Sequence, residues 1–98
     1  MEIEVTKNGN ELTLAPAGRL DTATAPQMQK VVEENIGGVT DLTCDLKNLK
    51  YLSSAGLRVL MRVQKTMSKQ GTMKLVNVNE DIMEIFDMTG LADMFNIV

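Results

Sequence analysis

The chain has 98 residues, which is enough for one domain and too few for two. Hydrophobic residues make up 44% of it and charged residues 23%, as is typical of a folded globular domain. The net charge of −3 gives the chain no general attraction for nucleic acid or for an anionic membrane. We therefore expect a single domain over residues 1–98 that binds neither directly.

Several residue types and motifs are absent. There is no histidine, which removes Ser–His triads, histidine acid–base catalysis and histidine metal ligands. The single cysteine, Cys44, cannot form an internal disulfide, and its alternation with core residues indicates a buried, inert thiol. No signal peptide, membrane span or nucleotide or calcium motif is visible. We expect a cytoplasmic protein that is not an enzyme and has no metal site and no cofactor.

The N-terminal half predicts a hairpin, a helix and a strand. Residues 2–6 and 12–14 alternate apolar and polar side chains around Asn8-Gly9, a strong hairpin signal. Residues 15–18 (APAG) break the alternation. Apolar residues at helical spacing follow between 28 and 36, and a further alternation at 42–46 predicts a strand. Candidate N-caps of the helix are Asp21, Thr22 and Thr24.

The C-terminal half begins with a predicted loop over residues 47–54, which leads into a long helix ending at Gln70-Gly71. A strand over 73–78 and a helix capped by Asn79 come next. The spacing of Leu91, Met94, Phe95 and Val98 predicts a last amphipathic helix. The expected order is ββαβαβαα. This order defines an α/β fold with a mixed sheet of about four strands and several helices.

Two serines, Ser53 and Ser54, lie where the loop enters the long helix. Their simplest role is capping, in which a serine oxygen accepts a hydrogen bond from the first helical turn. The same position also suits a phosphate, because a helix N-terminus favours negative charge. Catalysis by either serine is disfavoured, since there is no histidine and no Gly-x-Ser-x-Gly elbow.

Three segments together resemble the STAS domain, the fold of bacterial anti-sigma factor antagonists. Residues 52–60 (LSSAGLRVL) are similar to the family pattern Asp-Ser-Ser/Thr-Gly-Leu-Gly-x-Leu. Residues 18–25 (GRLDTATA) resemble Gly-x-Leu-Asp-x-x-Thr-Ala, and residues 86–91 (FDMTGL) resemble Phe-x-hydrophobic-x-Gly-Leu. The blocks stand in the family's order, and the resemblance covers nearly the whole chain.

The resemblance implies a partner-switching role. In this family the unmodified antagonist binds an anti-sigma factor that is also a serine kinase. The kinase phosphorylates a serine of the antagonist and breaks the complex, and a PP2C-type phosphatase restores it. The matching phosphoacceptor is Ser54, and the neighbouring Ser53 is the alternative. Ser53 stands at the family's aspartate, and Ala55 replaces its second hydroxyl residue, so this chain departs from the pattern on both sides of Ser54.

The expected partner-binding residues surround this serine and are Asp21, Asp45, Ser53, Ser54, Gly56 and Arg58. Other roles remain open for several of them: capping for Asp21, loop stabilisation for Asp45, and close helix–sheet packing for Gly56. The basic row of Arg58, Arg62, Lys65 and Lys69 is a solvated helix face, a surface that attracts an acidic partner, or a group that helps to hold a phosphate. The alternative function is an unphosphorylated STAS interaction subunit of a transport or other signalling complex.

Overall fold

The fold begins with the predicted hairpin, in a computed structural model that describes all residues from 1 to 98. Strands β1 (Glu2–Asn8) and β2 (Glu11–Leu20) pair antiparallel in an unbroken register from Glu2↔Ala17 to Asn8↔Glu11. Gly9 lies in the turn with a positive φ of 61°, a conformation that glycine adopts without strain. The hairpin signal in the sequence is thus confirmed.

Strand β2 is longer than predicted, because Pro16 does not end it. The first half of β2 pairs in parallel with β3 (Asp41–Asp45) as far as Leu14, and its last residues pair with β4 (Leu49–Leu52) from Gly18 onward. Pro16 therefore falls between these two partners, where its missing N–H interrupts neither parallel ladder. The expected break at residues 15–18 is wrong for this reason.

The sheet has six strands, in the order β1-β2-β3-β5-β6 with β4 attached to β2. Strands β5 (Thr72–Val76) and β6 (Asn96–Ile97) extend it on the side of β3, and every pairing except β1–β2 is parallel. The mixed α/β sheet is confirmed. The expected count of about four strands was too low by the two short strands β4 and β6.

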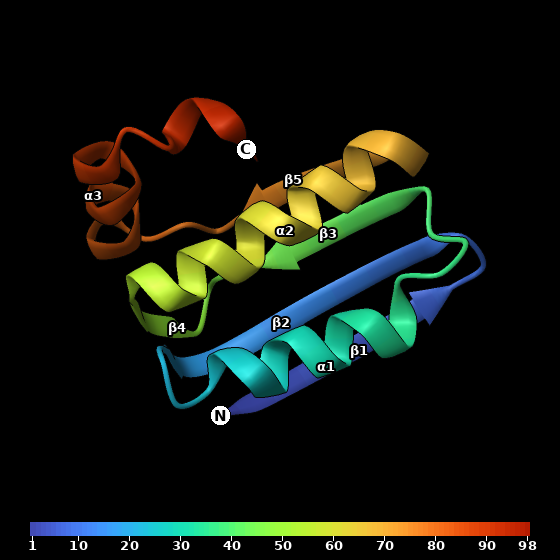
Figure 1. Ribbon diagram of the computed structural model, residues 1–98, viewed down its shortest axis with the longest axis horizontal. Coiled ribbons are helices and arrows are strands. Elements are labelled where there is room, and N and C mark those ends of the chain that lie inside the picture. Colours follow the sequence, from blue (N-terminus) through green and yellow to red (C-terminus); the bar gives the residue numbers. More distant parts are fainter.

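Three helices complete the domain: α1 (Ala25–Asn35), α2 (Ser54–Gln70) and α3 (Glu80–Thr89). Figure 1 shows α1 and α2 next to each other over one face of the sheet, with α3 beyond its end near β4. Their apolar sides and the inward residues of the strands form one core cluster of 22 buried residues. Asn79 caps α3 as expected, since its Oδ1 accepts a hydrogen bond from Ile82 N at 2.9 Å.

The sequence predicts a loop where the structure has strand β4. Its two buried residues, Leu49 and Leu52, are separated by two exposed ones, so the segment lacks the alternation of a strand. Only its pairing with the second half of β2, through a register shift between Gly18 and Arg19, gives it extended structure.

The predicted C-terminal helix is wrong as well. Residues Ala92–Met94 form a single 3₁₀ turn, η1, and the chain then enters β6. Phe95 packs edge-on against Phe86 with ring centroids 5.3 Å apart, and Val98 N donates a hydrogen bond to Leu75 O. Pairing with β5 therefore satisfies backbone groups that a helix would have bonded internally.

Candidate functional site

The junction of β4 and α2 places Ser53 as the N-cap of the helix. Its backbone is extended (φ −92°, ψ 175°), and its Oγ accepts a hydrogen bond from Gly56 N at 3.3 Å. Ser53 N also donates to Leu20 O at 3.0 Å, which ties the junction to the end of β2. Ser53 thus fills the capping role that the sequence offered to both serines.

Ser54 is the first residue of α2, and its side chain is exposed. No side-chain hydrogen bond within the chain involves its hydroxyl. The hydroxyl stands at the helix end where N–H groups without intrahelical partners and the helix dipole favour negative charge. The expectation of an exposed hydroxyl at the start of a helix is confirmed. The site could accept an anionic group without loss of the cap.

Gly56 is buried and holds the first turn of α2 against the sheet. A Cβ at this position would lie 2.6 Å from Leu20 O and 2.7 Å from Leu52 Cδ1, distances at which something must shift. Glycine is therefore required for the close approach of helix and strands. The packing role suggested by the sequence is confirmed, and Gly56 offers no side chain to a partner.

Asp21 lies in the β2–α1 loop, directly after Leu20 and thus beside the Ser53 junction. Its carboxylate accepts hydrogen bonds from Ala23 N (3.0 Å) and Thr24 N (3.2 Å) and pairs with Arg19 Nε (3.4 Å). Partial burial of the carboxylate on its own raises the pKa, but these bonds outweigh it and leave the pKa of Asp21 below its usual range. Asp21 therefore stays ionised and fixes the loop that leads into α1.

A cation–π pair links the two strands that carry these loops. Arg19 in β2 is in register with Tyr51 in β4, and its guanidinium carbon lies 4.2 Å from the ring centroid. No local pattern in the sequence indicates this pair, because the pair depends on β4, where the sequence predicts a loop. Both side chains are exposed within two residues of the loops that hold Asp21 and Ser53.

A groove of about 330 Å³ runs between the first turns of α1 and α2, next to Ser54. We refer to it as the α1–α2 groove. Its lining includes Thr22, Pro26, Gln29, Ala55, Arg58 and Arg62. Arg58 follows Ser54 by four residues and so lies on the same side of the helix one turn later. The two arginines are exposed and have no ion-pair partner in the chain, so this groove is electropositive.

Asp45 is placed apart from this group. It lies at the end of β3, in register with Val76 of β5 and one residue beyond the last β3 residue that pairs with β2. Its carboxylate accepts hydrogen bonds from Asn77 Nδ2 (3.0 Å) and Lys47 N (3.1 Å). Mainly through Asn77, and despite opposing desolvation, these bonds lower the pKa of Asp45. These contacts match the loop-stabilising role rather than a position beside Ser54.

The structure thus brings together Asp21, Ser53, Ser54 and Arg58 at one end of the sheet, with Gly56 beneath them. No cluster of potential metal ligands is present anywhere in the chain. No helix combines the length and apolar character that crossing a membrane requires.

The STAS domain family matches residues 2–98, and the chain belongs to this family. Among curated proteins, it is 33% identical over 98 residues to the anti-sigma-B factor antagonist of Bacillus subtilis (strain 168), with 99% of this chain and 90% of that protein covered. The resemblance seen in the three sequence motifs is therefore confirmed at the level of the family.

Solved structures agree on the fold. The crystal structure of an anti-sigma factor antagonist from Mycobacterium paratuberculosis matches with a TM-score of 0.88 at 21% identity, covering 98% of this chain and 83% of that one. The Bacillus cell fate determinant SpoIIAA in its phosphorylated form matches with a TM-score of 0.75 at 17% identity, covering 99% and 91%. At these identities the likeness is one of architecture.

Proposed function

We propose that this chain is an anti-sigma factor antagonist that binds its partner through the surface around Ser54 and is inactivated by phosphorylation of Ser54. The observation that carries the proposal is the exposed hydroxyl at the first residue of α2, next to a separate residue that caps the helix. The name of the Bacillus subtilis relative supports the same class of function.

The geometry of α2 explains how a phosphate would act as a switch. On Ser54 it would add roughly −1.5 to −2 charges at a helix end that favours anions, so the fold would persist. A partner that packs against the neutral hydroxyl would then have to desolvate a dianion, which strongly disfavours the complex. Binding is therefore lost through charge, and removal of the phosphate restores it.

The implied partners are an anti-sigma factor with serine kinase activity and a PP2C-type phosphatase. Asp21, whose lowered pKa keeps its carboxylate ionised, and Arg58, one turn after Ser54 on α2, would supply charged contacts to the anti-sigma factor. Ser53 replaces a carboxylate of the family pattern, so the kinase would meet a less negative surface here. Arg58 adds a positive charge one turn further on.

The direct test is a phosphorylation assay with the anti-sigma factor kinase encoded in the same genome and Mg-ATP, read by mass spectrometry of intact protein and peptides. We expect one phosphate on Ser54 in the wild type and in Ser53→Ala, and none in Ser54→Ala. Treatment with a PP2C-type phosphatase should remove it. A phosphate confined to Ser53 would refute the assignment of Ser54.

The second candidate is a constitutive STAS interaction subunit, which the serine at the family's aspartate position favours. It predicts that the kinase transfers no phosphate to this chain. It also predicts that Ser54→Asp still weakens binding to whatever partner occupies the surface. The phosphorylation assay therefore separates the two candidates.

A further inference from the structure

A second groove, distinct from the α1–α2 groove, lies on the outer side of α2 where η1 approaches it. Its volume is about 440 Å³, and we call it the α2–η1 groove. Its lining includes Arg58, Met61, Arg62, Lys65, Ser68 and Met94. Arg58 and Arg62 line both grooves, whereas Lys65, Ser68 and Met94 belong to this one alone.

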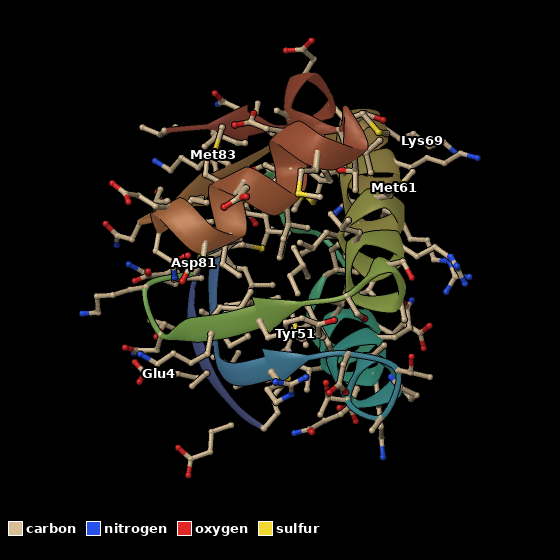
Figure 2. The ribbon with its side chains drawn as sticks, turned by 90° about the vertical axis from the view of Figure 1, so that its left-hand side faces the viewer. Glu4, Tyr51, Met61, Lys69, Asp81 and Met83 are labelled. Carbon is tan, nitrogen blue, oxygen red and sulfur yellow. The ribbon has the colours of Figure 1, made fainter.

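The groove has a strong positive charge that the chain does not neutralise. Helix α2 carries four basic residues and no acidic one, although the chain as a whole has a net charge of −3. The only ion pair in the structure joins Arg19 to Asp21, so every base on α2 lacks an acidic partner. Figure 2 shows Met61 and Lys69 on the α2 side of the molecule and Asp81 of α3 on the opposite side.

Methionine supplies the apolar part of the groove. Met94 is 44% exposed, and Met61 is half-buried against the core. Methionine is unbranched and polarisable, and it is common on surfaces that adapt to a partner helix. Apolar methionines beside a row of bases complement a helix with one apolar face and an acidic flank.

The length of the groove fits a short helix. Ser68 lies ten positions after Arg58, which at 1.5 Å per residue is about 15 Å, or close to three helical turns. Ser68 lies fourteen residues beyond Ser54, about 21 Å along the same helix. Only the Arg58 end of the groove is therefore near the phosphorylation site.

We propose that the α2–η1 groove is a docking surface for an acidic amphipathic helix of a protein partner. Lys65 and Arg62 attract an acidic flank, and Met61 and Met94 receive the apolar face. The surface goes beyond the proposed switch, because most of it is too far from Ser54 for a phosphate there to block it. A partner could remain attached through this groove while the contact around Ser54 is broken.

The test is a binding titration of the full chain with a stapled helical peptide of about three turns, with leucines at i, i+4 and i+7 and glutamates on both flanks. We expect NMR shift changes along residues 58–68 and 92–94, with Lys65→Glu weakening binding at least about tenfold. The matched control is Lys30→Glu on α1, an exposed lysine outside the groove, which should change affinity less than about twofold.

Two control peptides test whether both the acidic and the apolar side chains of the docked helix are needed. A peptide with lysine in place of glutamate, and one with serine in place of leucine, should not bind. Equal affinity of Lys65→Glu and wild type, or shift changes elsewhere, would overturn the proposal. So would Lys65-dependent binding to phosphatidylglycerol vesicles without peptide binding, or Lys65-dependent self-association in sedimentation. None of these measurements uses the kinase, so failure here leaves the Ser54 proposal standing.

Discussion

Ser53 and Ser54 are consecutive residues with opposite environments at the start of α2. Ser53 Oγ accepts a hydrogen bond from Gly56 N at 3.3 Å, whereas the Ser54 hydroxyl is exposed and has no partner within the chain. The helix cap and the candidate phosphoacceptor are therefore different residues. Mutation can remove either one without the other, which makes the two roles separable by experiment.

We expect the two alanine substitutions to differ in stability. Ser53→Ala removes the cap and should lower the free energy of unfolding by about 0.5–1 kcal/mol. Ser54→Ala removes an exposed, unbonded hydroxyl and should change it by less than about 0.5 kcal/mol. Urea unfolding followed by circular dichroism measures both. A larger loss in Ser54→Ala than in Ser53→Ala would show that the cap has been misassigned.

The effect of charge at position 54 can be tested without a kinase. Ser54→Asp should weaken binding to the anti-sigma factor at least about tenfold, or about 1.4 kcal/mol, because the carboxylate must be desolvated in the interface. In Ser54→Asn the new side chain is nearly as large as that of aspartate but carries no charge, so this variant should weaken binding much less. Isothermal titration calorimetry gives both values. Equal losses would indicate that size rather than charge controls the complex.

At Gly56 we expect the usual stabilising effect of a Gly→Ala substitution in a helix to be reversed. In an open helix position Gly→Ala stabilises by about 1 kcal/mol, but here the new methyl group would lie 2.6 Å from Leu20 O. We expect Gly56→Ala to lower stability by about 1–3 kcal/mol and the melting temperature by roughly 4–8 °C per kcal/mol. The control is Gly37→Ala, since a Cβ at Gly37 meets nothing within 4 Å. Stabilisation by Gly56→Ala would disprove the close packing of α2.

The lowered pKa of Asp45 makes part of the stability depend on pH. Because folding lowers this pKa, the contribution is fully present above the unfolded value of about 3.8 and is lost as the pH falls through the folded value. Asn77→Ala removes the hydrogen bond that contributes most to the lowered pKa of Asp45. It should therefore be more destabilising at pH 7 than at pH 3. Urea unfolding at the two pH values tests this. In an Asp45→Asn background the pH dependence of the Asn77→Ala effect should disappear.

Cys44 should be unreactive in the folded protein. Burial raises the pKa of its thiol to about 12, and the side chain is inaccessible. Modification by Ellman's reagent at pH 8 should therefore proceed only as fast as the protein unfolds, whereas an added surface thiol in Ser68→Cys should react at once. Rapid labelling of Cys44 in the native protein would contradict its place in the core.

Local patterns in the sequence were sufficient for much of the site. The hydroxyl pair, the helix that follows and the aspartate after Leu20 are short-range features, and the structure places Asp21, Ser53 and Ser54 close together as expected. Asp45 was harder to place. Its distance from Ser54 depends on β4, whose pairing with β2 involves residues about thirty positions apart and leaves no local alternation.

The C-terminal error has a related cause. The spacing of Leu91, Met94 and Phe95 fits one face of a helix, yet the same residues also fit a single turn followed by a strand. The choice is made by contacts outside the segment: with Phe86, nine residues before Phe95, and with β5, whose paired residues lie 22 positions earlier than those of β6. Burial of Phe95 and pairing beside Leu75 outweigh the weak helical preference of a segment this short.

The contact between Gly56 and Leu20 has a consequence for signalling. It holds the first turn of α2 directly against Leu20 O and the Leu20 and Leu52 side chains, so a group added at Ser54 has little room to tilt or shift the helix. A charged group at Ser54 would therefore change the electrostatic potential of this surface without changing the position of α2. If Ser54 is phosphorylated as proposed, the partner protein must distinguish the two forms by charge rather than by the shape of this chain.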